Sequence, residues 1–236
     1  KYIKKKLVFF ISTENEPSTD QIDYLKKQIT ESLKNKKNTC QSIVGIGGGS
    51  ILDITIALSL MINNSGKTEK YQGWDKIPKK GINSIGIPTI SGTGAETSRT
   101  CVLINKKKNL KLGINSNFSV FDQLILDPNL TKTVPLSQYF YTAMDTYIHS
   151  FESLNGSFRN LIADNYNISA LNLCKQIFQS QNIKSIHNRS KLMTASYMGG
   201  IALSSTLVGL VHPFSAGLSV VFGIHQHYFV LGFVLS

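Results

Sequence analysis

The residues best suited to chemistry in this chain are a carboxylate and several imidazoles in its C-terminal half. Asp145 and His149, in AMDTYIHSFE, are four residues apart, so on a helix both side chains project from one face. His212, in GLVHPFSAG, and the pair His225 and His227, in GIHQH, supply further imidazoles. A carboxylate with imidazoles is a ligand set for Fe(II) or Zn(II). The alternative for Asp145 and His149 is an ordinary hydrogen bond.

Two loops rich in small residues could bind an anion in the N-terminal half. Residues 47–49, all glycine, stand between the apolar run SIVGI and the helical pattern SILDITIALSLMI, where backbone N–H groups and a helix dipole favour a phosphate. Ser50 and Asp53 have the spacing of a capping box, so the alternative is that they only cap the helix. The second loop, PTISGTGAETS, follows the next strand and carries several hydroxyls. Two such loops at strand ends favour a nucleotide, and the alternative for the second is a polar turn.

The elements that must position these residues alternate in the first half of the chain. We expect strands at 6–12, 42–46 and about 84–90, and helices at 18–35 and 50–62. This alternation predicts an α/β fold with a parallel sheet covered by helices. From Pro135 onward, long helical patterns follow one another without strands, so we expect an α/β domain over residues 1–134 and an all-helical domain over residues 135–236.

Composition restricts the class of protein. With 236 residues and 42% apolar residues the chain can form sizeable cores. The net charge of +11 raises nucleic-acid binding as an alternative, but the lysines form short clusters without interleaved aromatic residues, which favours a solvated surface. The sequence shows no run of about eighteen apolar residues and no cleavage signal, so we expect a cytoplasmic protein without a membrane or nucleic-acid partner.

The motifs GGGSILD, GIPTISGTGAETS, LDPNLTKTVP, AMDTYIHSFESLNG and GLVHPFSAG occur here in the order found in iron-containing (group III) alcohol dehydrogenases. The chain resembles that family over residues 7–224. The resemblance implies a Rossmann-like dinucleotide-binding domain, a helical domain, a divalent metal (Fe²⁺ or Zn²⁺) between them, and NAD(P) as cofactor. More narrowly, YQGWD, LKLGINSNF and VGLVHPFSAGLSVV resemble the family's 3-deoxy-D-manno-octulosonate (Kdo) 8-oxidases, which oxidise the C8 hydroxyl of that sugar acid towards 8-amino-Kdo for lipopolysaccharide.

The resemblance also assigns site residues by position. The expected cofactor-binding residues are Gly47, Gly48, Gly49, Ser50 and Asp53 in the pyrophosphate loop, Thr89, Ser91 and Thr93 in the second loop, and Lys111 near the cofactor ribose. The expected metal ligands and catalytic residues are Asp145, His149 and His212. The family's fourth ligand, a histidine, corresponds to Gln226 here, so we take the adjacent His225 as the fourth ligand, with His227 as the alternative.

Several positions depart from the family pattern. The family's D-x-A-K becomes DITI, which places Thr55 and Ile56 at the Ala and Lys positions, and Ala216 replaces a proton-relay histidine. After about residue 224 the resemblance ends, so we expect a C-terminally truncated helical domain. The predicted function is a metal-dependent oxidoreductase that acts on a primary alcohol of a small anionic sugar acid. The alternatives are an inactive remnant that retains nucleotide binding, or an iron-type dehydrogenase for another alcohol. A homodimer, and NAD, NADP or dioxygen as acceptor, stay open.

Overall fold

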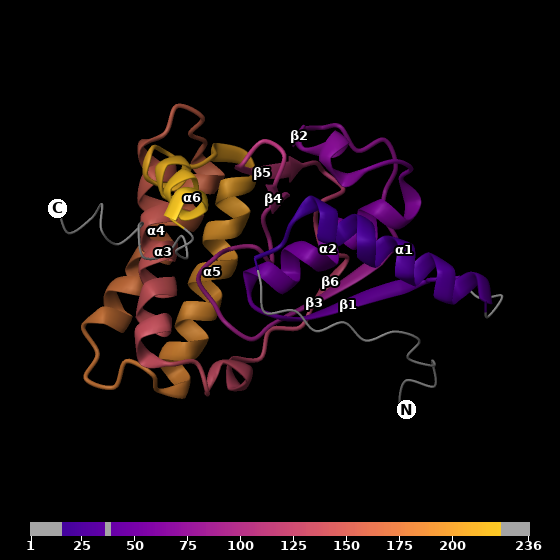
Figure 1. The fold of residues 1–236 in the computed structure, drawn as a ribbon. Helices are drawn as coiled ribbons and strands as arrows, with labels where there is room; N and C mark the ends of the chain where they lie inside the picture. Colours follow the sequence, from indigo (N-terminus) through magenta and orange to yellow (C-terminus); the bar gives the residue numbers. More distant parts are fainter. Residues whose placement is uncertain (1–15, 36–38, 223–236) are drawn as a thin grey trace.

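The computed structural model describes residues 16–35 and 39–222, which form an α/β half and a helical half lying side by side (Figure 1). The predicted strand at 6–12 lies outside the described residues. In chain order the elements are α1 (Thr19–Asn35), β1 (Ser42–Gly47), α2 (Gly49–Asn63), the 3-10 helix η1 (Thr68–Tyr71), β2 (Gly73–Trp74), β3 (Asn83–Pro88), β4 (Thr100–Asn105), β5 (Leu110–Asn115), β6 (Gln123–Leu124), the 3-10 helix η2 (Pro128–Thr131), α3 (Leu136–Asn155), α4 (Leu161–Phe178), α5 (Ile186–Thr206) and α6 (Val211–Phe222).

Helices α1 and α2 form the core of the α/β half together with the strands. In α1 the apolar residues Ile22, Leu25 and Ile29 recur at helical spacing and are all buried. Helix α2 is apolar on nearly every side, since it contacts α1 as well as β1, β3 and β4. Burial on all sides explains why this helix is not amphipathic, and it fixes the position of the glycine loop at its N-terminus.

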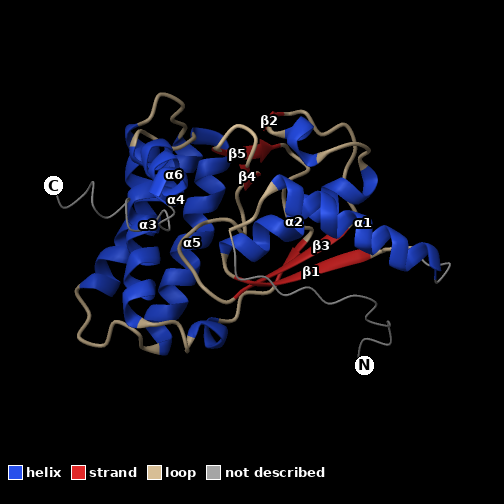
Figure 2. Ribbon diagram, in the orientation of Figure 1, coloured by secondary structure: helices blue, strands red, loops and turns tan. Residues whose placement is uncertain are grey.

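The strands form two sheets (Figure 2). The first has the order β1-β3-β6 and is parallel, with Val44 opposite Ile85, as the sequence predicts. The second has the order β2-β5-β4, and its β4 and β5 form an antiparallel pair that the sequence interpretation missed. The turn between them contains the lysine run at 106–108 and Asn109, whose φ of +51° suits asparagine. The alternating apolar residues of TCVLIN and LKLGIN on either side of this turn are the signal for a hairpin.

Helices α3 to α6 make the helical half, which agrees with the predicted all-helical C-terminal region. Its core includes a cluster of Tyr139, Ala143, Ile177 and Leu192. The first long helix, α3, begins at Leu136, next to the predicted domain boundary. Within the described part of the chain no single helix is long and apolar enough to cross a membrane. The pair α5 and α6, bent by 101°, meets that test only when both helices are taken together.

Candidate metal and nucleotide site

A buried cluster of three side chains that could hold a metal ion lies between α3 and α6. Asp145 and His149 are four residues apart on α3, and His212 comes from the first turn of α6. One ligand atom from each residue lies within 4.8 Å of the other two, and the three side chains are buried. The structure therefore brings together the three residues that the sequence analysis assigned to one metal.

The geometry of this cluster suits a cation. Nε2 of His212 lies 3.2 Å from Oδ1 of Asp145, and Nδ1 of His149 lies 3.9 Å from Oδ2 of the same carboxylate. The rings of His149 and His212 stack with centroids 3.9 Å apart and planes inclined by 16°. One carboxylate and two imidazoles within reach of a single point fit Fe(II) or Zn(II), which take nitrogen and oxygen ligands at about 2 Å. The predicted fourth ligand, His225, lies outside the described residues.

Glu152 lies behind the cluster, against His212, and sequence reasoning missed it. Its Oε2 faces Nδ1 of His212, and its Oε1 accepts a hydrogen bond from the backbone N–H of Val211 at 2.6 Å. Glu152 lies seven residues after Asp145 and three after His149, so helical periodicity places all three on one face of α3. That spacing was the signal available in the sequence.

The carboxylates on both sides of His212 control its charge. Burial disfavours the charged imidazolium, but hydrogen bonds and charges from Asp145 and Glu152 outweigh it and raise the pKa of His212 to about 9. Burial likewise disfavours the Glu152 carboxylate, yet the hydrogen bond from His212 holds the pKa of Glu152 below its ordinary value. The environment of His212 is therefore strongly negative, as a site for a cation requires.

The glycine loop between β1 and α2 leaves no room for side chains. A Cβ on Gly47 would lie 2.6 Å from Cβ of Ile51, and one on Gly48 would lie 2.9 Å from Cγ2 of Ile90. Gly48 is the N-cap of α2 and no side chain caps this helix, so the alternative that Ser50 and Asp53 form a capping box is wrong. Backbone N–H groups at a helix N-terminus, together with the helix dipole, are typical of a phosphate site.

The second loop lies directly against the first. The backbone N–H of Thr89 donates to the carbonyl of Gly47 at 2.9 Å, and a Cβ on Gly49 would lie 3.1 Å from Oγ1 of Thr93. Oγ of Ser91 is buried and makes no hydrogen bond within the described part of the chain. The two loops that the sequence assigned to a cofactor are thus in direct contact, and the second contains a buried hydroxyl.

The second loop is also bonded to the helical half. Oγ of Ser196 on α5 accepts from the N–H groups of Gly92 and Gly94, at 2.9 and 3.2 Å, and donates to Glu96 at 2.7 Å. Oγ1 of Thr146, the residue after Asp145, donates to the carbonyl of Gly92 at 2.9 Å. The loop that the sequence assigned to the cofactor and α3, the helix that carries Asp145 and His149, are therefore in direct contact. The sequence did not predict the bond between Ser196 and this loop.

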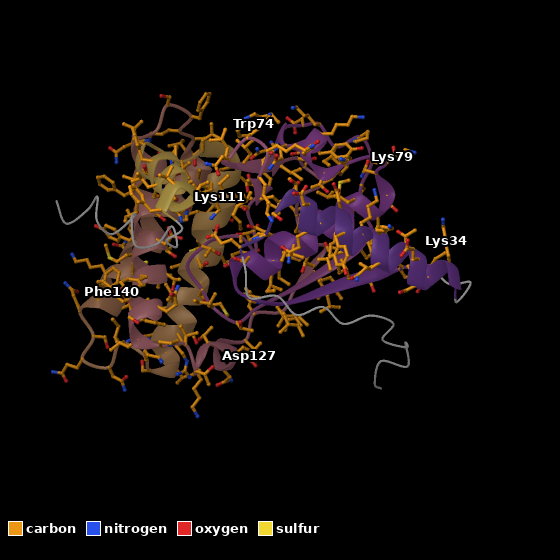
Figure 3. The ribbon with its side chains drawn as sticks, in the orientation of Figure 1. Lys34, Trp74, Lys79, Lys111, Asp127 and Phe140 are labelled. Atoms are coloured by element: carbon orange, nitrogen blue, oxygen red, sulfur yellow. The ribbon has the colours of Figure 1, made fainter. Side chains whose placement is uncertain are left out.

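Asp53, in the first turns of α2 after the glycine loop, is within electrostatic reach of Lys111. Nζ of Lys111 lies 2.9 Å from Oε2 of Glu16, and Figure 3 places Lys111 where the two halves of the molecule meet. Burial raises the pKa of Asp53 to about 7, although a hydrogen bond from the backbone of Val102 and the charge of Lys111 oppose that shift. The position of Lys111 at the junction is compatible with its predicted contact to a cofactor ribose.

Two family models, which match successive parts of the chain, describe the same family. Residues 3–128 match the family model described as iron-containing alcohol dehydrogenase, and residues 139–231 match that of the C-terminal part of the Fe-containing alcohol dehydrogenase family. The chain is 33% identical over 213 residues to a sulfoacetaldehyde reductase of Bilophila wadsworthia (strain 3_1_6), a match that covers 89% of this chain and 54% of that protein. It is 29% identical over 182 residues to an NAD-dependent methanol dehydrogenase of Bacillus methanolicus, covering 76% of this chain and 48% of that protein. The chain spans about half the length of these relatives.

Solved structures agree with the fold. A sulfoacetaldehyde reductase from Bifidobacterium kashiwanohense, in complex with NAD⁺, superposes with a TM-score of 0.81 at 26% identity, over 92% of this chain and 57% of that chain. An alcohol dehydrogenase from Oenococcus oeni superposes with a TM-score of 0.84 at 23% identity, over 92% of this chain and 56% of that chain. These matches confirm the predicted fold class, a Rossmann-like α/β domain followed by an all-α domain.

Proposed function

The chain belongs to the iron-containing alcohol dehydrogenase family, and we propose that it carries the metal and nucleotide sites of an oxidoreductase for a primary alcohol. In the proposed reaction R–CH₂OH and NAD(P)⁺ give R–CHO, NAD(P)H and a proton. The observation that carries the proposal is the convergence of Asp145, His149 and His212 beside a loop that also contacts the glycine loop.

In the proposed site Asp145, His149 and His212 hold a divalent cation, with His225 as the fourth ligand. The metal, when bound, supplies a Lewis acid that lowers the pKa of the substrate hydroxyl. Asp145 contributes negative charge. The two imidazoles contribute neutral donors, and His212, whose pKa is about 9 without metal, would release the proton on Nε2 when the cation binds. The burial of all three side chains strengthens each of these electrostatic interactions and keeps bulk water away.

The nucleotide site is proposed at the two adjacent loops. The N-terminus of α2 with Gly47, Gly48 and Gly49 binds the pyrophosphate, because backbone donors and the helix dipole both favour an anion there. A nicotinamide nucleotide, when bound, supplies the hydride acceptor. Lys111 contributes a positive charge at the junction of the two halves, where the cofactor ribose would lie in the proposed site. The hydroxyls of Thr89, Ser91 and Thr93 complete the proposed set, together with Ser50 and Asp53.

We propose an anionic alcohol as the substrate, with the C8 hydroxyl of Kdo as the specific candidate. The motif resemblance described above supports Kdo, and the net charge of +11 favours the approach of anions. The competing substrate is another small alcohol or aldehyde. The B. wadsworthia relative is named as a reductase of sulfoacetaldehyde, which is also a small anion. We therefore choose this compound for comparison with Kdo. Oxidation of Kdo but not of isethionate, the alcohol that corresponds to sulfoacetaldehyde, supports the specific proposal, and the reverse preference overturns it.

The metal site is tested by metal analysis of purified protein. We expect His149→Ala to lose the bound Fe or Zn, because one of the clustered donors is removed. The matched control is His187→Ala, which removes an exposed histidine from the first turn of α5. Retention of the metal by folded His149→Ala would remove this cluster from the proposed function.

The nucleotide site is tested by calorimetry with NAD⁺ and NADP⁺. We expect Gly48→Asp to abolish binding, because its carboxylate would occupy the loop and repel the pyrophosphate. The control Ser65→Asp adds the same charge at an exposed position beyond the other end of α2. Equal affinities for Gly48→Asp and the unchanged chain would show that the nucleotide does not bind at this loop.

A further inference from the structure

We propose that Glu152 is a positioning residue that fixes the ring of His212 so that Nε2 points at the metal. This inference rests on the proposed metal site. It assigns to Glu152 a role that is separate from ligation, since its carboxylate oxygens face His212 Nδ1 and Val211 N–H rather than the cluster.

Glu152 contacts consecutive residues at the start of α6. Its Oε1 accepts the backbone N–H of Val211 at 2.6 Å, and its Oε2 faces the ring nitrogen Nδ1 of His212. The first contact places a negative charge at the N-terminus of a helix, where the dipole stabilises it. The second contact holds the ring. One carboxylate therefore sets both the backbone of α6 and the orientation of the ligand that α6 carries.

The segment between α5 and α6 is built closely around this carboxylate. A Cβ on Gly209 would lie 2.7 Å from Oε1 of Glu152 and 3.0 Å from its Cδ, so a larger residue there would displace this carboxylate. The neighbouring residue on α3, Ser153, bonds to Oγ1 of Thr206 at 2.5 Å and accepts from Nδ2 of Asn167 at 2.6 Å. These contacts hold the end of α5, and hence the start of the segment that leads to His212, against α3.

The orientation of His212 follows from the two nitrogens of its ring. When Nδ1–H donates to Glu152, the proton of the neutral ring is on Nδ1, and Nε2 keeps its lone pair. Nε2 is the atom that faces Asp145, at 3.2 Å, and so belongs to the cluster. A carboxylate acceptor behind a ligating imidazole also raises its basicity, and loss of such a partner typically weakens metal binding by about 10- to 100-fold.

The decisive variant is Glu152→Gln, measured by titration of the metal-free chain with Co²⁺ and by the Co²⁺ absorption spectrum. The amide oxygen of Gln can still accept from Val211, but its NH₂ group cannot accept from Nδ1 of His212. We expect the Co²⁺ affinity to fall by about 10- to 100-fold and the spectrum to change. The matched control is Asp164→Asn, which neutralises another buried carboxylate of the helical half, paired with Arg159. This control should leave affinity and spectrum unchanged.

A second measurement needs no variant and so does not depend on whether Glu152→Gln folds. With Zn²⁺ bound to the unchanged chain, ¹⁵N NMR of His212 should show the proton on Nδ1 and the metal on Nε2. Metal on Nδ1, or wild-type affinity and spectrum in Glu152→Gln, would overturn the inference while leaving the metal site intact. If instead His149→Ala binds Co²⁺ as the unchanged chain does, the proposed metal site itself fails. The two failures are thus distinguishable.

Discussion

Replacement of Gly92 by alanine should separate the second loop from the helical half. Gly92 has a φ of +141°, and a Cβ there would lie 2.1 Å from the backbone oxygen of Thr142 and 2.5 Å from its carbonyl carbon. These are backbone atoms of α3, so no flexible side chain can move aside. The loop or the helix must shift, and either movement breaks the bonds that Gly92 makes to Ser196 and Thr146.

The expected loss of folding free energy in Gly92→Ala has three contributions. A non-glycine residue at positive φ costs about 1–2 kcal/mol. Overpacking against a rigid neighbour costs about 1–3 kcal/mol. Each lost hydrogen bond costs about 1 kcal/mol. Because a shift that relieves the contact also breaks the bonds, these parts overlap, and we expect the free energy of unfolding of Gly92→Ala to fall by about 3–5 kcal/mol.

Urea unfolding followed by circular dichroism measures this loss. With a slope of about 3 kcal/mol per molar urea, the urea concentration at the midpoint of unfolding should fall by about 1–1.7 M. The matched control is Gly66→Ala, where φ is +90° but no atom lies within 4 Å of the added Cβ. In this control only the positive φ is unfavourable, so its free energy of unfolding should fall by about 1–2 kcal/mol. Equal shifts in both variants would refute the close contact between this loop and α3.

Two further predictions concern a carboxyl group of the α/β half and the core of the helical half. Because burial raises the pKa of Asp53 from 3.8 to about 7, the folded chain binds more protons than the unfolded chain between these values. Its free energy of unfolding should therefore fall as pH rises from about 4 to 7, by up to about 1.4 kcal/mol per pH unit. Asp53→Asn should lack this part of the pH dependence. If the free energies of unfolding of the variant and the unchanged chain depend on pH in the same way, the prediction is wrong. Leu192→Ala, in the helical core, should cost about 2–5 kcal/mol by thermal or urea unfolding, whereas Leu161→Ala, at an 81% exposed position, should stay within about 0.5 kcal/mol.

The sequence by itself determined the features that depend on neighbours along the chain. The periodicity of residues 18–35 predicted α1, the glycines at 47–49 marked the turn from β1 into α2, and the spacing of Asp145 and His149 placed them on one helix face. Each of these signals is contained within a few turns or a single loop. Backbone geometry converts such spacing directly into position, and no knowledge of packing is needed.

Only the tertiary structure decided which distant groups meet. Nε2 of His212 reaches Asp145 across 67 residues, and Ser196 reaches the N–H of Gly92 across 104 residues. Glu152 shares the face of α3 with the ligands, yet its role follows from the way α6 begins against it. The antiparallel pairing of β4 with β5 is another contact between segments, and the lysine run between the two strands is equally compatible with a solvated loop. The physical reason is that contacts of this kind depend on how helices and strands pack, and one sequence pattern is compatible with several packings.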